Sequence, residues 1–213
     1  MTNSSFYPLL VHKTLMFQDN NVLAIQCSDT QNVQYAIFCD DKGLYHGNET
    51  DGFTLLAVLD NITLLDKPIK MYYHFPYICV TEQFGLNASV VKITDGKTLK
   101  LARLDYHCDV SSYSIGFLEY NGSVLLIHQT QWYRLDITDL ETGELLTESD
   151  IIYLDTDDIV TTESGVYHKT ERKRFIPYFH SLIHVSPDCK HFLSNGWVWT
   201  PQDKINHSSR QFF

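Results

Sequence analysis

The stretch Phe179–Asp203 constrains the fold most, because short apolar runs alternate in it with turn residues. Ser186-Pro187-Asp188-Cys189-Lys190 predicts a tight turn, since proline presets φ and aspartate bonds its own backbone. Asn195-Gly196 predicts a second turn, because both residues tolerate positive φ. The runs Lys190–Ser194 and Trp197–Thr200 are apolar and aromatic, as strands are. The stretch therefore predicts three short strands joined by two tight turns.

The same pattern recurs earlier in the chain. Asn121-Gly122, the strongest short hairpin signal, separates the apolar runs Ser114–Tyr120 and Ser123–Gln129. Trp132–Ile137 follows as a third run, and Asp139–Glu144 turns the chain toward a fourth. This segment predicts a four-stranded antiparallel unit.

The spacing of these units predicts the fold class. Asp95-Gly96 and Thr142-Gly143 hold comparable places in two units and lie 47 residues apart. A period of roughly 40–50 residues with four strands per unit is typical of a β-propeller blade. We therefore expect an all-β, propeller-like repeat of about four to five blades that forms a single domain over residues 1–213. A β-sandwich is the alternative, since it also has many short strands with regular turns.

A family resemblance points the same way. SPDCKHFLSNGWVWTP resembles the blade motif of WD-repeat-like and related bacterial propellers, although Cys189 stands where glycine is usual. WYRLDITDLETGELL is similar to the outer half of such a blade. The resemblance implies stacked antiparallel blades. A propeller left open by too few blades would be completed by a homodimer, and the tail Ile205–Phe213 carries no strand signal.

Charge and cysteine usage restrict the partners and the compartment. The 213 residues carry a formal net charge of −10, which disfavours binding to nucleic acid. The five cysteines are widely spaced and form no CxxC pair, so we expect them to be reduced in the cytoplasm. No apolar run approaches the roughly 20 residues of a membrane helix. Asn-x-Ser/Thr triplets such as Asn48-Glu49-Thr50 are interpreted as turn chemistry.

The three tryptophans are the candidate binding residues. They are Trp132, Trp197 and Trp199, and the last two share a strand face by the period of two. Packing in the core or between blades is the simpler explanation of all three. The functional interpretation is an aromatic anchor for a protein or peptide partner.

No catalytic, metal or cofactor site is predicted. His180 and His184 lie roughly 13 Å apart if both are on one strand, too far for one metal ion. Asp155–Asp158 lacks the following glycine and the twelfth-position glutamate of a calcium loop. The sequence contains neither the G-x-S-x-G of a nucleophile elbow nor a phosphate loop.

Three functions remain open at this level. The first is a non-enzymatic propeller-like scaffold that binds a protein or peptide. The second is a hydrolase or lyase whose site lies in the propeller channel. The third is an acidic immunity- or inhibitor-type protein that covers a basic partner. The net charge of −10 favours this interpretation.

Overall fold

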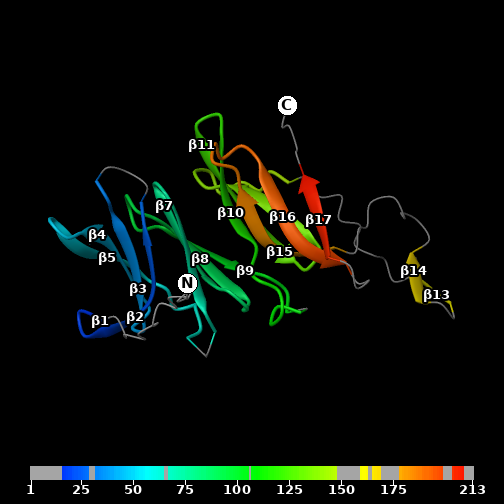
Figure 1. Ribbon diagram of the computed structural model, residues 1–213, viewed down its shortest axis with the longest axis horizontal. Coiled ribbons are helices and arrows are strands. Elements are labelled where there is room, and N and C mark those ends of the chain that lie inside the picture. Colours follow the sequence, from blue (N-terminus) through cyan, green and yellow to red (C-terminus); the bar gives the residue numbers. More distant parts are fainter. Residues whose placement is uncertain are drawn as a thin grey trace, which may run out of the picture. The chain divides into compact units, whose positions relative to one another are not determined.

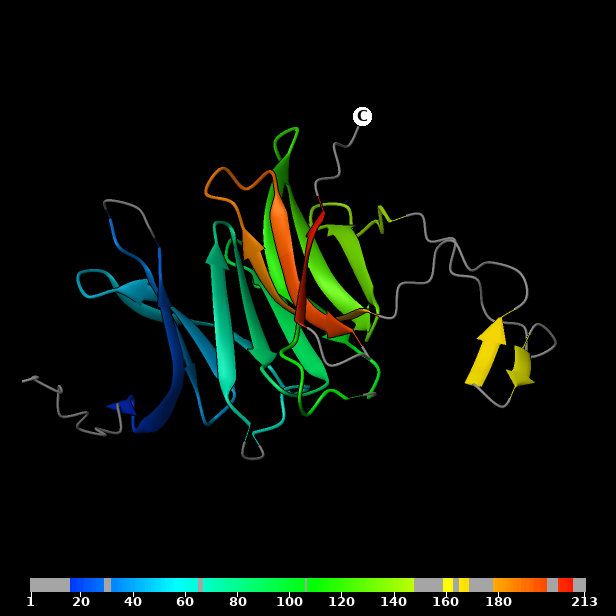
Figure 2. The same cartoon turned by 45° about the vertical axis from the view of Figure 1, so that its right-hand side comes forward.

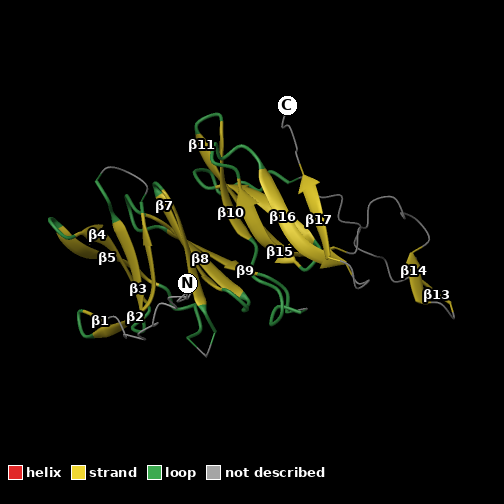
Figure 3. Cartoon of the chain, viewed as in Figure 1, coloured by secondary structure: helices red, strands yellow, loops and turns green. Residues whose placement is uncertain are grey.

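The computed structural model describes eight stretches of the chain and confirms the all-β prediction. Every residue of these stretches is strand or loop, and none is helical (Figure 3). Among them, no helix is long and apolar enough to cross a membrane. The described residues are 16–28, 32–64, 67–105, 107–147, 159–162, 165–168, 178–198 and 203–208.

The strands form five antiparallel sheets, each built from consecutive strands (Figure 1). The first sheet contains β1 (Met16–Phe17), β2 (Asn20–Cys27), β3 (Tyr35–Cys39), β4 (Gly43–Asn48) and β5 (Gly52–Val58). The second contains β6 (Ile69–His74), β7 (Tyr77–Glu82), β8 (Asn87–Lys92) and β9 (Thr98–Ala102). The third contains β10 (Ile115–Tyr120), β11 (Ser123–Gln131) and β12 (Arg134–Asp139). The fourth pairs β13 (Ile159–Thr162) with β14 (Gly165–His168), and the fifth contains β15 (Tyr178–Val185), β16 (Phe192–Val198) and β17 (Asp203–Ser208).

This succession of meander sheets is the propeller-like arrangement that the repeat predicts. The second sheet has four strands, and a bridge from Thr138 to Leu145 adds a fourth element beside β12. The chain divides into two compact units, one of Met1–Val80 with Ser89–Leu99 and one of Thr81–Ala88 with Lys100–Phe213. That residues 1–213 form a single domain stays a prediction.

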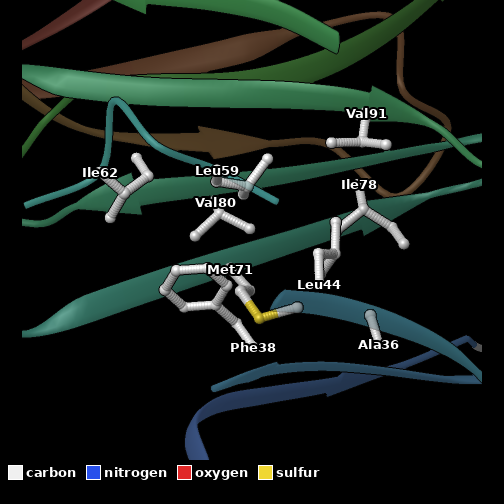
Figure 4. Close-up of a cluster of buried hydrophobic side chains, with 9 residues drawn as sticks. All are labelled: Ala36, Phe38, Leu44, Leu59, Ile62, Met71, Ile78, Val80 and Val91. Carbon is white, nitrogen blue, oxygen red and sulfur yellow. The ribbon is translucent and has the colours of Figure 1, made fainter. Parts of the chain in front are cut away.

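The first unit is held together by an apolar core. Figure 4 shows these side chains pointing toward one another from β3, β4, β6, β7, β8 and the segment that follows β5. The buried members are Ala36, Phe38, Leu44, Leu59, Ile62, Met71, Ile78, Val80 and Val91. Burial of apolar surface is therefore the main stabilising contribution in this unit.

The opposite face of the first sheet carries an aromatic cluster. Tyr45 and Ile37 are cross-strand partners and are buried there. The ring of Phe17 lies 5.0 Å from that of Tyr45 and 5.1 Å from that of Phe53. The hydroxyl of Tyr45 donates to Asp41 at 2.7 Å, and this bond, with burial, raises the pKa of Tyr45 to about 12.

In the second unit, β10 and β15 run side by side (Figure 2). Gly116 permits this approach, because a Cβ there would lie 2.9 Å from side-chain atoms of Ile183 and Val185. Leu118, Leu125, Ile127, Ile137 and Ile183 form the small apolar core between the two sheets. Ser114 adds a hydrogen bond from its hydroxyl to the carbonyl of Ser181.

Most predicted turns are confirmed. Asn121 and Gly122 adopt φ of 50° and 84° between β10 and β11, as the hairpin signal requires. The predicted first turn of the last sheet lies between β15 and β16, where the amide of Cys189 donates to Ser186 at 2.9 Å. Asn48 accepts from the amides of Thr50 and Asp51, which is the turn chemistry expected of its triplet.

Two expectations for the last sheet were wrong. Asn195-Gly196 is not a turn but lies inside β16, with Gly196 paired to His180. A Cβ on Gly196 would lie 1.9 Å from the carbonyl oxygen of Phe179, so glycine serves close approach of two strands. The tail without a strand signal contributes to β17, whose pairing with β16 outweighs its weak propensity.

Candidate functional site

Three aromatic rings of the second unit form a continuous stack. The ring of Phe179 lies 3.9 Å from that of Trp197 at an interplanar angle of 5°. Its other neighbour is Trp132, at 4.3 Å and 29°. We call Trp132, Phe179 and Trp197 the aromatic stack. The ring of His107 meets Phe179 and Trp197 edge-on, at 5.7 Å and 6.2 Å.

Strand register places two of the three rings. Phe179 and Trp197 are cross-strand partners on β15 and β16, so their side chains leave the sheet on the same face. Gly196 lets the two backbones approach at the neighbouring pair. Trp132 comes from the turn between β11 and β12, and its carbonyl accepts from the amide of His180 at 2.9 Å. The stack is thereby tied to three strands.

Gln129 fixes this arrangement from β11, where it is 1% exposed. Its amide nitrogen donates to the carbonyls of Trp132 at 3.4 Å and His180 at 3.2 Å. Its amide oxygen accepts from Nη1 of Arg103 at 2.6 Å. The side chain of Gln129 therefore connects the backbone at Trp132 and at His180, the residue after Phe179, to the buried cation Arg103.

Arg103 is 5% exposed and is held by uncharged groups. Its Nε donates to the carbonyl of Gly85 at 2.8 Å, and its Nη2 donates to the carbonyls of Cys108 at 2.8 Å and Ser111 at 2.7 Å. Its guanidinium carbon also lies 4.9 Å from the centroid of the Tyr113 ring. Burial lowers the pKa of Arg103, but an arginine side chain stays charged in a folded protein at neutral pH. The side chain thus clamps the loop that carries His107.

His180 lies beside the stack in a neutral form. Its Nδ1 is 2.7 Å from the hydroxyl of Ser194, and burial lowers its pKa to about 4. The hydroxyl of Tyr178 donates to the carbonyl of the same serine at 2.8 Å. At neutral pH the side chain of His180 therefore adds no charge to the site.

The chemistry of the site is that of an aromatic surface. Phe179 is 1% exposed and supports the stack from within, whereas Trp132 and Trp197 are each half-buried. A half-buried indole presents apolar area and an electron-rich face to a partner at low entropic cost. Because buried hydrogen bonds fix its supports, the surface is preorganised.

A second polar group of the same unit is structural. Asp136, 3% exposed, accepts from Nη2 of Arg134 at 2.6 Å and from the hydroxyls of Thr130 at 2.6 Å and Thr147 at 2.8 Å. Nε2 of His128 meets the hydroxyl of Thr138 at 3.1 Å, and burial lowers the pKa of His128. These contacts tie β11, β12 and Thr147 to one another.

The first unit contains a shallow polar hollow of about 450 Å³. Residues from the start of β3 and from the β4–β5 turn line it, among them Gln34, Tyr35, Glu49 and Asp51. The amide of Asn48 already serves the turn, since it donates to Asp51 at 2.8 Å and accepts two backbone amides. The side chain of Asn48 in this hollow is therefore engaged in the turn.

Of the predicted binding residues, the structure brings Trp132 and Trp197 together through Phe179. Trp199 lies outside the described residues, as do Asp155–Asp158. The binding residues predicted from the sequence did not include Phe179, His107, Arg103 or Gln129. The only sequence signal for Phe179 was its place opposite Trp197, which the mistaken turn at Asn195-Gly196 concealed.

Comparison with known proteins does not assign a family. No protein-family model matches the chain, and no curated protein matches it. Among solved structures, the chain is similar to one titled "Streptogramin B lyase structure", at 10% sequence identity and a TM-score of 0.46. The match covers 92% of this chain, which spans 57% of the length of that structure. The fold class accordingly rests on the succession of antiparallel sheets itself.

Proposed function

We propose that this chain is a non-enzymatic, propeller-like domain that binds a protein or peptide partner through the aromatic stack. The observation that carries the proposal is the pair of half-buried indoles stacked on a buried Phe179. Tryptophans in such settings dominate the energetics of protein interfaces. Gln129 and Arg103 add to this observation, because their hydrogen bonds support the backbone beside the stack.

A binding surface gains from such support, because fully hydrogen-bonded buried groups select a single arrangement. An apolar core keeps its stability with approximate packing, but a buried arginine requires every donor to be satisfied. Here Arg103 and Gln129 fix the loop of His107 and the carbonyls of Trp132 and His180. The result is a surface with one geometry, which lowers the entropic cost of binding.

We propose the cytoplasm as the compartment, as expected from the cysteines. Burial raises the pKa of Cys39 to about 11 and also raises that of Cys79, so both thiols are protonated and unreactive at neutral pH. A thiol that packs as a small apolar side chain suits a reducing environment.

The test is a selection of short random peptides on the immobilised full chain. Binders are then assayed against Trp197→Leu, which removes an outer ring of the stack, and against Trp197→Phe, which keeps a ring. Phe53→Leu is the matched control, because it removes a ring from the aromatic cluster of the first unit. We expect peptides that lose binding to Trp197→Leu and keep most of it with the other two variants. Peptides that bind all folded variants equally contradict the proposal, and cooperative unfolding of each variant confirms that it is folded.

A further inference from the structure

The loop that joins β9 to β10 borders the aromatic stack and is acidic. It carries His107, whose ring contacts Trp197 and Phe179, between the exposed carboxylates Asp105 and Asp109. Leu104 and Val110 flank them and are 59% and 62% exposed. Residues 104–112 contain two aspartates and neither lysine nor arginine.

The backbone that carries the two aspartates is held by hydrogen bonds on either side. The amide of Leu104 donates to the carbonyl of Thr130 at 3.2 Å, which ties the loop to β11 two residues before Trp132. Arg103 holds the carbonyls of Cys108 and Ser111, and the hydroxyl of Ser111 donates to the carbonyl of His107 at 2.9 Å. The acidic loop is thus anchored to the same arginine as the stack.

Both arginines among the described residues of this unit are already engaged. Arg103 is buried, and Arg134 is bound to Asp136 with its side chain 14% exposed. The described part of the loop that borders the stack therefore exposes negative charge, in a chain with 26 acidic and 16 basic residues. Such a surface attracts a positive partner and repels a negative one.

We infer that the segment that docks on the aromatic stack is cationic and presents an arginine to the indole faces, with Asp105 and Asp109 as its counter-charges. The inference rests on the proposed function and names the chemistry of its partner. A guanidinium is planar, so it stacks on an indole while its edge donates to carboxylates. Exposed Leu104 and Val110 supply apolar contacts for the stem of the arginine and its neighbours.

The experiment uses the peptides that depend on Trp197 in the selection described above. Each is resynthesised with its arginines replaced by citrulline, which keeps the shape and removes the charge. Affinities for the full chain are measured by fluorescence anisotropy at low and physiological salt. We expect the peptides to be rich in arginine, and each citrulline exchange to weaken binding about 2- to 30-fold.

Two charge-removing variants separate local from overall electrostatics. Asp105→Asn with Asp109→Asn removes the acidic pair beside the stack, and Glu49→Gln with Glu144→Gln removes two exposed carboxylates elsewhere. We expect the first pair to weaken binding several-fold and to flatten its salt dependence, and the second to have little effect.

The outcomes distinguish the two proposals. Peptides that depend on Trp197 but are neutral or acidic, or tolerate citrulline, overturn the cationic partner and leave the binding site standing. Equal losses of affinity from the two pairs of substitutions also overturn the cationic partner site. The peptide would then be attracted by the net charge of the chain and not by Asp105 and Asp109. A selection that yields no peptide dependent on Trp197 overturns the proposed function and this inference together.

Discussion

The two compact units are stabilised by different interactions. In the first, the buried polar side chains are few, Ser28 and Ser89 among the described residues, and the core is apolar. In the second, the described residues bury an arginine, a glutamine, a histidine and two carboxylates beside small apolar clusters. Those buried polar side chains include Glu82, Arg103, His128, Gln129 and Asp136.

The difference explains why the candidate site lies in the second unit. Apolar contacts are non-directional, so the first core tolerates substitutions that keep its volume. Buried hydrogen bonds are directional and costly to leave unmade, so they select one arrangement. The hydrogen bonds of Gln129 hold the backbone at Trp132 and His180, and they thereby align the aromatic stack.

The largest effect is expected from Arg103→Met. It leaves the Gln129 oxygen and several carbonyls buried without their donor, which we expect to lower the free energy of unfolding by about 4 kcal/mol. Arg103→Lys keeps the charge but cannot reach the same acceptors, so its loss is expected to be nearly as large. Urea unfolding of the full chain measures both. Full stability of Arg103→Lys would contradict this expectation, because the site would then require only a positive charge and not the planar guanidinium.

The next effect tests the apolar core. Leu44→Ala is expected to cost about 3 kcal/mol, because Leu44 is fully buried among apolar neighbours. Leu44→Met keeps the volume and is expected to cost less than about 1.5 kcal/mol. The contrast to be measured is between a small loss of stability in Leu44→Met and a large loss in Arg103→Lys. Equal tolerance at both sites contradicts it.

A pH effect of intermediate size is expected from His180. Its pKa in the folded state, about 4, lies below the ordinary value near 6.5, so the unfolded state binds the proton first as pH falls. Stability is therefore fully present above pH 6.5 and is lost progressively down to pH 4, by about 2 kcal/mol after a discount for partial exposure. His46 and His128 add to the loss, since burial lowers their pKa values too.

The matched variants for this effect are His180→Asn and His184→Asn. The first keeps an acceptor for the hydroxyl of Ser194 and removes the titrating ring, so unfolding at pH 7 and pH 5 should differ less than in the unchanged chain. The second removes an exposed histidine of the same strand. An unchanged pH dependence in His180→Asn contradicts the assignment.

The smallest effect is expected on the surface. Lys97 is 83% exposed and lies 3.5 Å from Asp95. Because solvent screens this pair, Lys97→Ala is expected to leave the free energy of unfolding almost unchanged. The Arg134–Asp136 pair is buried and joined to two threonines, so Arg134→Ala should cost several times more. Thermal unfolding of the two variants side by side checks the ratio, and similar losses would contradict it.

Local patterns in the sequence predict the strands and most turns, because these depend on neighbouring residues. Asn121-Gly122 and the turn before Lys190 are of this kind. Gly196 misled the prediction, because the same absence of a Cβ that permits a turn also permits two strands to approach. The contacts of Arg103 with Gly85 and Gln129 join segments 18 and 26 residues away, and no local pattern signals them. The candidate site could thus be predicted only as separate tryptophans.

The central claim is that a partner binds at the aromatic stack. Hydrogen exchange of the full chain, with and without a saturating selected peptide, tests it most directly. We predict slower exchange in residues 104–112, in the turn around Trp132 and at β16, with no change in β2 to β5. Protection confined to the first unit, or none in these segments at saturation, would contradict the claim.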